Sequence, residues 1–148
     1  MQARLDFYKA NPVAMKAMVN LDLAAKQGAL ERPLKDLVRL RVSQINGCAY
    51  CVDLHVQEAR EAGETERRLA TLVVWRESPL FSERERAALA WAEALTLIAA
   101  DRVPEAVWES VRPHFSEAEL VELTLDIVAI NGWNRFAVAF RKVPADGK

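Results

Sequence analysis

The chain contains two cysteines, three positions apart, and one of its two histidines follows four positions after the second cysteine. These residues are Cys48, Cys51 and His55, in the stretch INGCAYCVDLH. An α-helix turns by about 100° per residue, so positions i, i+3 and i+7 lie on one face. The spacing therefore predicts that both sulfur atoms and the imidazole lie together. Such a group can carry out thiol redox chemistry, bind a metal ion, or only fill the core.

The surroundings of the two cysteines favour the reactive thiolate form. Asn46-Gly47 is typical of a turn, which places Cys48 in the first turn of a helix, near unpaired N–H groups and the positive end of the helix dipole. His55 is four residues beyond Cys51 and can meet its thiol. Such surroundings lower a cysteine pKa from about 8.5 to about 3.5–7.5. A thiolate attacks peroxides and disulfides, and a second thiol one turn away can then close an intramolecular disulfide.

Asp36 is a candidate third member of the site. If the chain reverses at Gly47, Asp36 lies 11 residues before the turn and His55 lies 8 residues after it. At about 1.5 Å rise per residue, the two side chains lie at similar depths on neighbouring antiparallel helices. An aspartate in that place can orient a catalytic imidazole and hold one tautomer. We therefore predict that Asp36 orients His55.

Metal and cofactor sites fit the sequence less well. Zinc needs four protein ligands, or three and a water. The two cysteines, His55 and Asp36 could supply them, but the chain has no second CxxC and no HxxxH motif. Haem attachment needs a histidine directly after the second cysteine, where Val52 stands, and a thioredoxin-like site needs a βαβ pattern, which is lacking. We expect no metal and no other cofactor.

The composition is that of one globular domain, residues 1–148, with 51% hydrophobic and 28% charged residues and a net charge of −1. Without clustered Lys and Arg, nucleic-acid binding is not expected. No apolar run approaches the roughly 18 residues of a membrane span, and the first residues lack the apolar core of a signal peptide. We therefore predict a cytoplasmic protein that does not enter a membrane. There, a CxxC pair is more typical of catalysis or metal binding than of a structural disulfide.

Nearly every segment is typical of helix, and none has the alternating pattern of a strand. Proline opens three of the helices, at 12, 33 and 104, and Ser-x-x-Glu capping boxes open two others, at 82–85 and 116–119. The predicted fold class is all-α, built on antiparallel helical hairpins. The expected helices span about residues 12–27, 33–46, 48–62, 64–75, 82–99, 104–113 and 116–141.

A short internal repeat suggests a duplicated helical hairpin. The tripeptide Ile-Asn-Gly occurs at 45–47 and again at 130–132, after an apolar helical segment in each case. In the first copy the cysteines and His55 follow, whereas the second copy has Trp133 and two phenylalanines. If the repeat is a true duplication, one copy carries chemistry and the other packing.

Longer segments of the chain resemble AhpD-like alkylhydroperoxidases, a group within the carboxymuconolactone decarboxylase superfamily. Residues 40–55, LRVSQINGCAYCVDLH, resemble the core motif of the group. WRESPLF at 75–81 and ERERAALAW at 83–91 resemble the segment that follows, and INGWNR at 130–135 resembles the late helix. The resemblance covers nearly the whole chain. It implies an all-helical fold that assembles into homo-oligomers, as trimers or hexamers.

The resemblance also implies a catalytic cycle. Cys51, paired with His55, reduces the hydroperoxide, and Cys48 resolves the product into a disulfide, although the helix-dipole argument alone favours Cys48 as the more acidic thiol. A thiol reductant protein, in the best-known branch one bearing a dihydrolipoyl group, then reduces the disulfide. That branch has glutamate where this chain has Asp36, one methylene shorter. The decarboxylase branch typically lacks the CxxC pair, which argues against lactone decarboxylation.

We therefore predict a thiol-dependent peroxidase that reduces alkyl hydroperoxides, with Cys51, Cys48, His55 and Asp36 as its catalytic residues. Two alternatives stay open. One is a dithiol–disulfide oxidoreductase or redox sensor with weak peroxidase activity. The other is a non-enzymatic oligomeric binding protein whose CxxC is structural or binds a metal.

Overall fold

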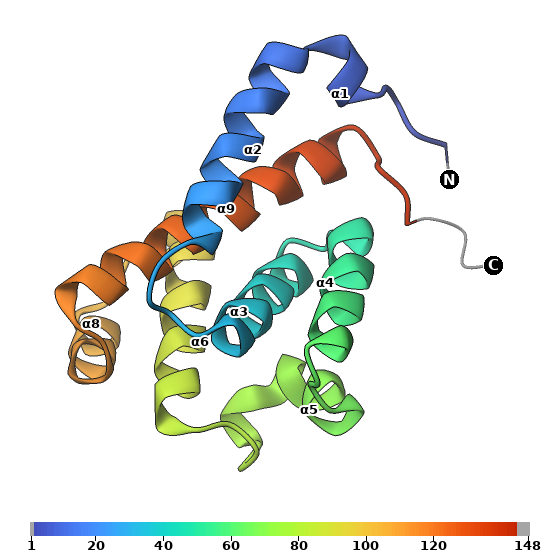
Figure 1. The fold of residues 1–148 in the computed structure, drawn as a ribbon. Helices are drawn as coiled ribbons and strands as arrows, with labels where there is room; N and C mark the ends of the chain where they lie inside the picture. Colours follow the sequence, from blue (N-terminus) through green and yellow to red (C-terminus); the bar gives the residue numbers. More distant parts are fainter. Residues whose placement is uncertain (1, 145–148) are drawn as a thin grey trace.

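The computed structural model describes residues 2–144, and within them the chain is helical, without β-strands (Figure 1). The predicted all-α fold class is confirmed. None of the helices in this part of the chain has the length and apolarity that a membrane span requires. The elements are α1 (Phe7–Ala10), α2 (Pro12–Lys26), α3 (Arg32–Ile45), α4 (Ala49–Glu61), α5 (Glu66–Thr71), the 3-10 helix η1 (Leu72–Glu77), α6 (Glu83–Thr96), α7 (Ile98–Asp101), α8 (Glu105–Val111), the 3-10 helix η2 (Arg112–His114) and α9 (Glu117–Ala139).

Helix α3 lies at the centre of the fold and packs against α4, α6 and α9 (Figure 1). Its apolar residues recur at three- and four-residue spacings on two sides. Leu34, Val38 and Val42 join one buried cluster with α6, α8 and α9. Leu37 and Leu40 join a second cluster with α4, α5, η1 and α6. Because both sides are buried, α3 is a fixed support for the helices around it.

The turn between α3 and α4 sets the position of the cysteine helix. Gly47 has a positive φ of 65°, a conformation that favours glycine, and it lets the chain reverse after α3. The Asn46 side-chain amide donates to Asn131 Oδ1 at 3.0 Å and to Asn134 Oδ1 at 2.8 Å. Asn134 in turn donates to Ser43 Oγ at 3.1 Å. These hydrogen bonds tie the end of α3, and the turn that leads to α4, to α9.

The two Ile-Asn-Gly copies have different structures, so the duplicated-hairpin hypothesis is wrong. Residues 45–47 end a helix, whereas residues 130–132 lie inside α9. A Cβ atom on Gly132 would lie 2.8 Å from Cε of Met18 on α2. Gly132 thus lies where α2 packs against α9, and it makes no turn.

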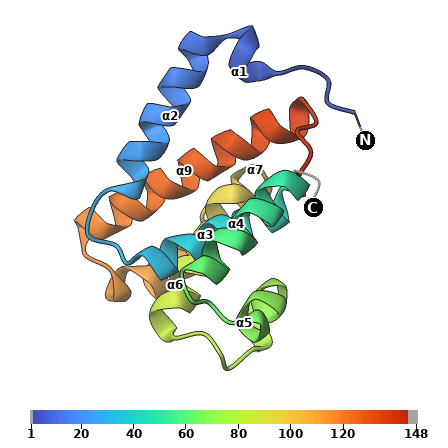
Figure 2. The ribbon, with the colours of Figure 1, turned by 45° about the vertical axis from the view of Figure 1, so that its right-hand side comes forward.

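The two ends of the described chain meet beside the end of α9 (Figure 2). The Arg4 backbone N–H donates to the Phe140 carbonyl at 2.9 Å. The Phe7 ring centroid lies 5.6 Å from that of Phe136 and 5.9 Å from that of Phe140. Helix α1 is thus held against α9 and faces the first turns of α4.

Most helix boundaries follow from local signals. Both predicted capping boxes, at 82–85 and 116–119, are present. The helix expected over 64–75 differs, because it divides into α5 and η1. A 3-10 helix aligns positions i and i+3, and this segment buries Leu72 and Trp75 at that spacing. Val74, inside this segment, has non-helical backbone angles (φ −120°, ψ 30°), so the chain is kinked there.

Candidate active site

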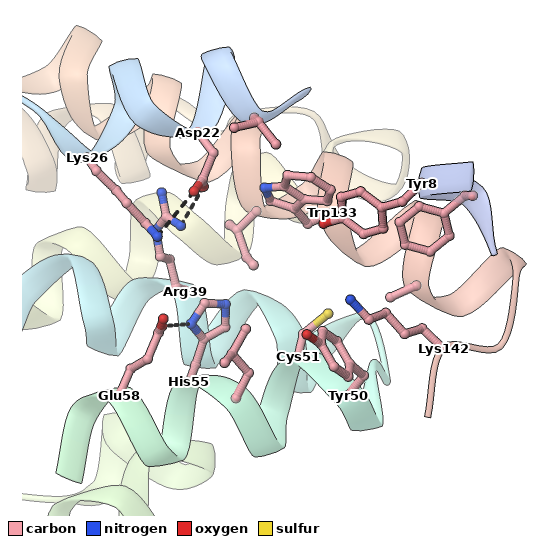
Figure 3. A pocket seen from close by; sticks show the side chains of 15 residues that line it. Tyr8, Asp22, Lys26, Arg39, Tyr50, Cys51, His55, Glu58, Trp133 and Lys142 are labelled. Atoms are coloured by element: carbon pink, nitrogen blue, oxygen red, sulfur yellow. Dashed lines mark hydrogen bonds and ion pairs between the residues drawn. The ribbon is translucent and has the colours of Figure 1, made fainter. Parts of the chain in front are cut away.

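A pocket of about 240 Å³ lies along one face of α4. Cys51 and His55 face it from α4, and side chains of α1, α2, α3 and α9 form the other walls (Figure 3). Both residues are almost fully buried from bulk solvent, with 3% and 5% exposure. The pocket is therefore the route by which a small molecule reaches them.

Cys48 and Cys51 form a disulfide, with their Cα atoms 5.3 Å apart. Cys48 is the N-cap residue of α4, as the Asn-Gly turn predicted, and its Sγ accepts a hydrogen bond from the Cys51 backbone N–H at 3.2 Å. Cys51 lines the pocket, whereas Cys48 packs behind it against Ala137. The two sulfur atoms are thus joined but unequal: one faces the pocket and the other caps the helix.

A carboxylate on the same helix orients the imidazole. His55 Nδ1 lies 2.8 Å from Glu58 Oε2 (Figure 3). The hydrogen bond with His55 holds the pKa of Glu58 below its ordinary value, against the opposing effect of burial. An ionised carboxylate only accepts hydrogen bonds, so Nδ1 carries the proton. The other ring nitrogen, turned away from Glu58, is then free to accept a proton.

Asp36 does not make the contact with His55 that the sequence predicted. Within residues 2–144, no hydrogen bond joins Asp36 to His55; its nearest ionic partner is Arg32, with Nε 3.5 Å from Oδ2. The spacing in the sequence predicts how far along its helix each side chain lies. It does not predict the direction in which the side chain points around the helix axis. Asp36 instead lines a neighbouring cavity of about 280 Å³ that Glu58 also reaches, and burial raises its pKa.

Buried ion pairs form one end of the pocket. Arg39 Nε and Nη2 donate to Asp126 Oδ1 at 2.8 and 2.5 Å, and Nη1 donates to Asp22 Oδ1 at 2.7 Å. Lys26 Nζ lies 3.2 Å from Asp22 Oδ2. Burial would lower the pKa of Arg39, but attraction by the two carboxylates outweighs it and raises that pKa. The charges at this end therefore pair with one another and join α2, α3 and α9, while Asp126 Oδ2 is buried without a hydrogen-bond partner among the described residues.

Aromatic side chains form the other end. The rings of Tyr8 and Trp133 stack with centroids 6.2 Å apart, and the Lys142 ammonium lies 4.0 Å from the centroid of the Tyr50 ring (Figure 3). Tyr50, which stands between the two cysteines, lies in the pocket wall. Tyr8 and Lys142 could not be found from sequence, because they come from opposite ends of the chain. Glu58 could have been, since it is three residues beyond His55.

A metal site requires several ligand side chains at one place. Within the described residues, no three side chains of the His, Cys, Asp or Glu type are grouped so that they could hold a metal ion. The arrangement suits proton transfer and sulfur chemistry instead: a pocket-facing sulfur, an oriented imidazole and a second sulfur already bonded to the first.

Comparison with known proteins adds the family. The sequence model of the Carboxymuconolactone decarboxylase family matches residues 12–94. YdfG of Bacillus subtilis (strain 168) is 42% identical over 139 residues, which cover 94% of this chain and 95% of YdfG.

Solved structures agree. The crystal structure of ATU0492 from Agrobacterium tumefaciens, a protein of unknown function proposed to be the antioxidant defence protein AhpD, superposes with a TM-score of 0.96 at 44% identity, over 99% of this chain and 100% of that one. An uncharacterized peroxidase-related protein from Silicibacter sp. TM1040 has a TM-score of 0.80 at 26% identity, over 94% of this chain and 74% of that one. The chain therefore belongs to the carboxymuconolactone decarboxylase family and is AhpD-like within it.

Proposed function

We propose that this protein is a thiol-dependent peroxidase that reduces organic hydroperoxides with the Cys48–Cys51 pair. One observation carries the proposal. Cys51 is bonded to Cys48 and faces a pocket that it shares with His55, whose ring is held by Glu58. The family and the peroxidase-related neighbours are consistent with it.

The first step acts on the reduced protein. His55 takes the proton of the Cys51 thiol, and the thiolate attacks the terminal oxygen of the hydroperoxide. A sulfur–oxygen bond forms as the oxygen–oxygen bond breaks, so two electrons pass from sulfur to the peroxide. The alkoxide takes the proton back from His55 and leaves as an alcohol, and Cys51 becomes a sulfenic acid.

The second step closes the disulfide. The Cys48 sulfur attacks the sulfenic sulfur of Cys51, and a sulfur–sulfur bond forms as the sulfur–oxygen bond breaks. The departing hydroxyl combines with the Cys48 thiol proton and leaves as water. The oxidised pair that results has the connectivity that the structure displays.

The third step needs an external dithiol, which we propose is carried by a protein, such as one with a lipoyl group. Its thiolate attacks Cys51, the sulfur that faces the pocket, and Cys48 leaves as a thiolate. A thiol of lower pKa leaves faster, and the helix N-terminus with the Cys51 N–H favours the Cys48 thiolate. The second thiol of the reductant then displaces Cys51. The dithiol thus becomes a disulfide, and its two electrons and two protons restore both cysteines. This cycle needs no metal or flavin.

The helix dipole and the pocket thus favour different cysteines for different steps. The dipole favours Cys48 as the more stable thiolate, which suits a leaving group. Access favours Cys51 as the sulfur that meets both the peroxide and the reductant. We therefore assign attack on the peroxide to Cys51 and resolution to Cys48.

We also propose that the protein works as a homo-oligomer, a trimer or hexamer as the resemblance implies. Large apolar side chains on α8 and α9 support this, because Val121, Val128 and Trp108 are exposed by 71%, 51% and 38% in the single chain. They line one shallow apolar groove with Trp91 and Leu125. An apolar surface of this kind is typical of a protein–protein contact.

Glu58→Gln tests the proton-transfer part of the proposal. We expect reduction of cumene hydroperoxide to slow by about tenfold to a hundredfold, because a neutral amide no longer supports the charge that His55 gains on taking the thiol proton. The measurement is kcat/KM with dithiothreitol as reductant.

Asp36→Asn is the matched control, since it also exchanges a buried carboxylate for an amide. It should have little effect on kcat/KM, and it should not lower stability at neutral pH, because the raised pKa of Asp36 means that its ionised form opposes folding. A slower Asp36→Asn enzyme beside a normal Glu58→Gln enzyme would return the orienting role to Asp36.

A further inference from the structure

The Lys142 ammonium group lies against three aromatic rings at one end of the pocket. Its Nζ lies 4.0 Å from the ring centroid of Tyr50, 5.2 Å from that of Tyr8 and 5.7 Å from that of Phe7. All four residues line the pocket with Cys51 (Figure 3). The rings come from α1 and α4, and the lysine comes from the segment after α9. Three separate parts of the chain therefore converge on one ammonium group.

The end of α9 fixes the lysine backbone. Arg141 has a positive φ of 52°, and its N–H donates to the Val138 carbonyl at 3.3 Å. The Lys142 N–H donates to the Ala137 carbonyl at 2.9 Å, which completes a Schellman helix end. A left-handed residue other than glycine is uncommon. Arg141 adopts that conformation here, and its backbone sets the direction in which Lys142 leaves α9.

The other cations around the pocket have acidic partners. Arg39 and Lys26 both pair with Asp22. Among residues 2–144, Lys142 forms no ion pair with an acidic side chain. Aromatic faces attract a cation but leave its charge in place. The aromatic end of the pocket therefore carries a positive charge that a bound anion would balance.

We infer that Lys142 binds a carboxylate of the substrate, so that the preferred hydroperoxides are those of organic acids with an apolar body. This rests on the proposed peroxidase function. Leu54, Ile130 and Trp133 line the same pocket and suit that apolar body. A single lysine is a point charge, which is enough for one carboxylate. The peroxide group would lie at Cys51 while the acid group lies at Lys142.

The test uses hydroperoxides that differ only in charge: cumene hydroperoxide and its meta- and para-carboxylate derivatives. For the wild type we expect kcat/KM to be about tenfold to a hundredfold higher with at least one carboxylate derivative, the size of one charge-assisted hydrogen bond. Added salt should reduce this preference. Lys142→Met should abolish the preference, because kcat/KM should fall much further for the carboxylate derivatives than for cumene hydroperoxide, while Lys142→Arg should keep most of it.

Lys9→Met is the matched control. Lys9 is an exposed lysine on α1 that pairs with Asp6 outside the pocket, so this variant also removes one positive charge. It should keep the preference for the carboxylate derivatives. Equal kcat/KM for charged and neutral hydroperoxides in the wild type would overturn the inference. So would an equal loss on both in Lys142→Met, which would mean that Lys142 acts on the Cys51 thiolate instead. If the wild type reduces none of the hydroperoxides, the proposed function itself fails.

Discussion

Cys51→Ser should reduce hydroperoxide turnover by about 1,000-fold or more, because a serine hydroxyl at this position is neither ionised nor able to form a sulfenic acid. Cys48→Ser should behave differently. Cys51 still faces the pocket beside His55, so the variant should complete one rapid turnover per chain and then hold a sulfenic acid on Cys51. For Cys51→Ser the measurement is consumption of cumene hydroperoxide with dithiothreitol present. For Cys48→Ser it is consumption by the reduced variant after the reductant has been removed, together with mass spectrometry after dimedone labelling.

The pair of variants separates the roles of the two sulfur atoms. A dimedone adduct on Cys51 in Cys48→Ser is the expected product. If Cys51→Ser consumed peroxide as fast as the wild type, the assignment of the attacking sulfur would be wrong. Rapid exchange of the wild type with insulin disulfides, combined with sluggish peroxide consumption, would favour the dithiol–disulfide oxidoreductase over the peroxidase.

Arg39→Met should lower the free energy of unfolding by about 3–5 kcal/mol, which is the usual cost of breaking a buried ion pair from one side. Arg39 and Asp126 are only 3% and 0% exposed, and Arg39 supplies two hydrogen bonds to one carboxylate oxygen. Without the guanidinium, the charge of Asp126 is buried and uncompensated. Urea unfolding at a fixed protein concentration, with the disulfide intact in both proteins, measures the loss.

Arg41→Met is the matched control for that loss. Arg41 also lies on α3 and pairs with Glu93, but Glu93 keeps hydrogen bonds from Trp75 at 2.8 Å and Arg76 at 2.7 Å. We expect a loss of only about 1 kcal/mol.

Removing both buried charges tests the cause of the Arg39 effect. The double variant Arg39→Met with Asp126→Leu should recover most of the stability that Arg39→Met loses, because no unpaired charge then remains in the core. A double variant less stable than Arg39→Met would show that packing, and not the unpaired charge, sets the cost.

Local patterns predicted the all-α fold class, and they predicted that Cys51 and His55 lie close together, as they do in one pocket. Cys48, Cys51 and His55 lie on one helix, so helical geometry alone brings them together. The capping boxes gave the starts of α6 and α9 because a cap depends only on residues within one turn. Glu58 was within reach of the same reasoning, since it lies on α4 at i+3 from the histidine.

Contacts between separate segments of the chain could not be predicted from local sequence patterns. The prediction for Asp36 required the angle between two helices, which spacing along the chain does not contain. From the sequence, Trp133 was expected to have a packing role. Its place in the pocket depends on how α9 packs against α2. Lys142 meets Tyr8 only because the Schellman end of α9 and helix α1 pack side by side. Gly132 repeated a turn signal but lies inside α9, where α2 packs against it.

The central claim is that two thiols of one chain reduce one hydroperoxide. Anaerobic thiol titration of the fully reduced protein, before and after one equivalent of cumene hydroperoxide, tests it most directly. The proposed chemistry requires the loss of both thiols per chain, formation of one equivalent of alcohol, and no crosslink between chains on a non-reducing gel. Retention of both thiols while peroxide persists, or oxidation only through crosslinks between chains, would contradict it.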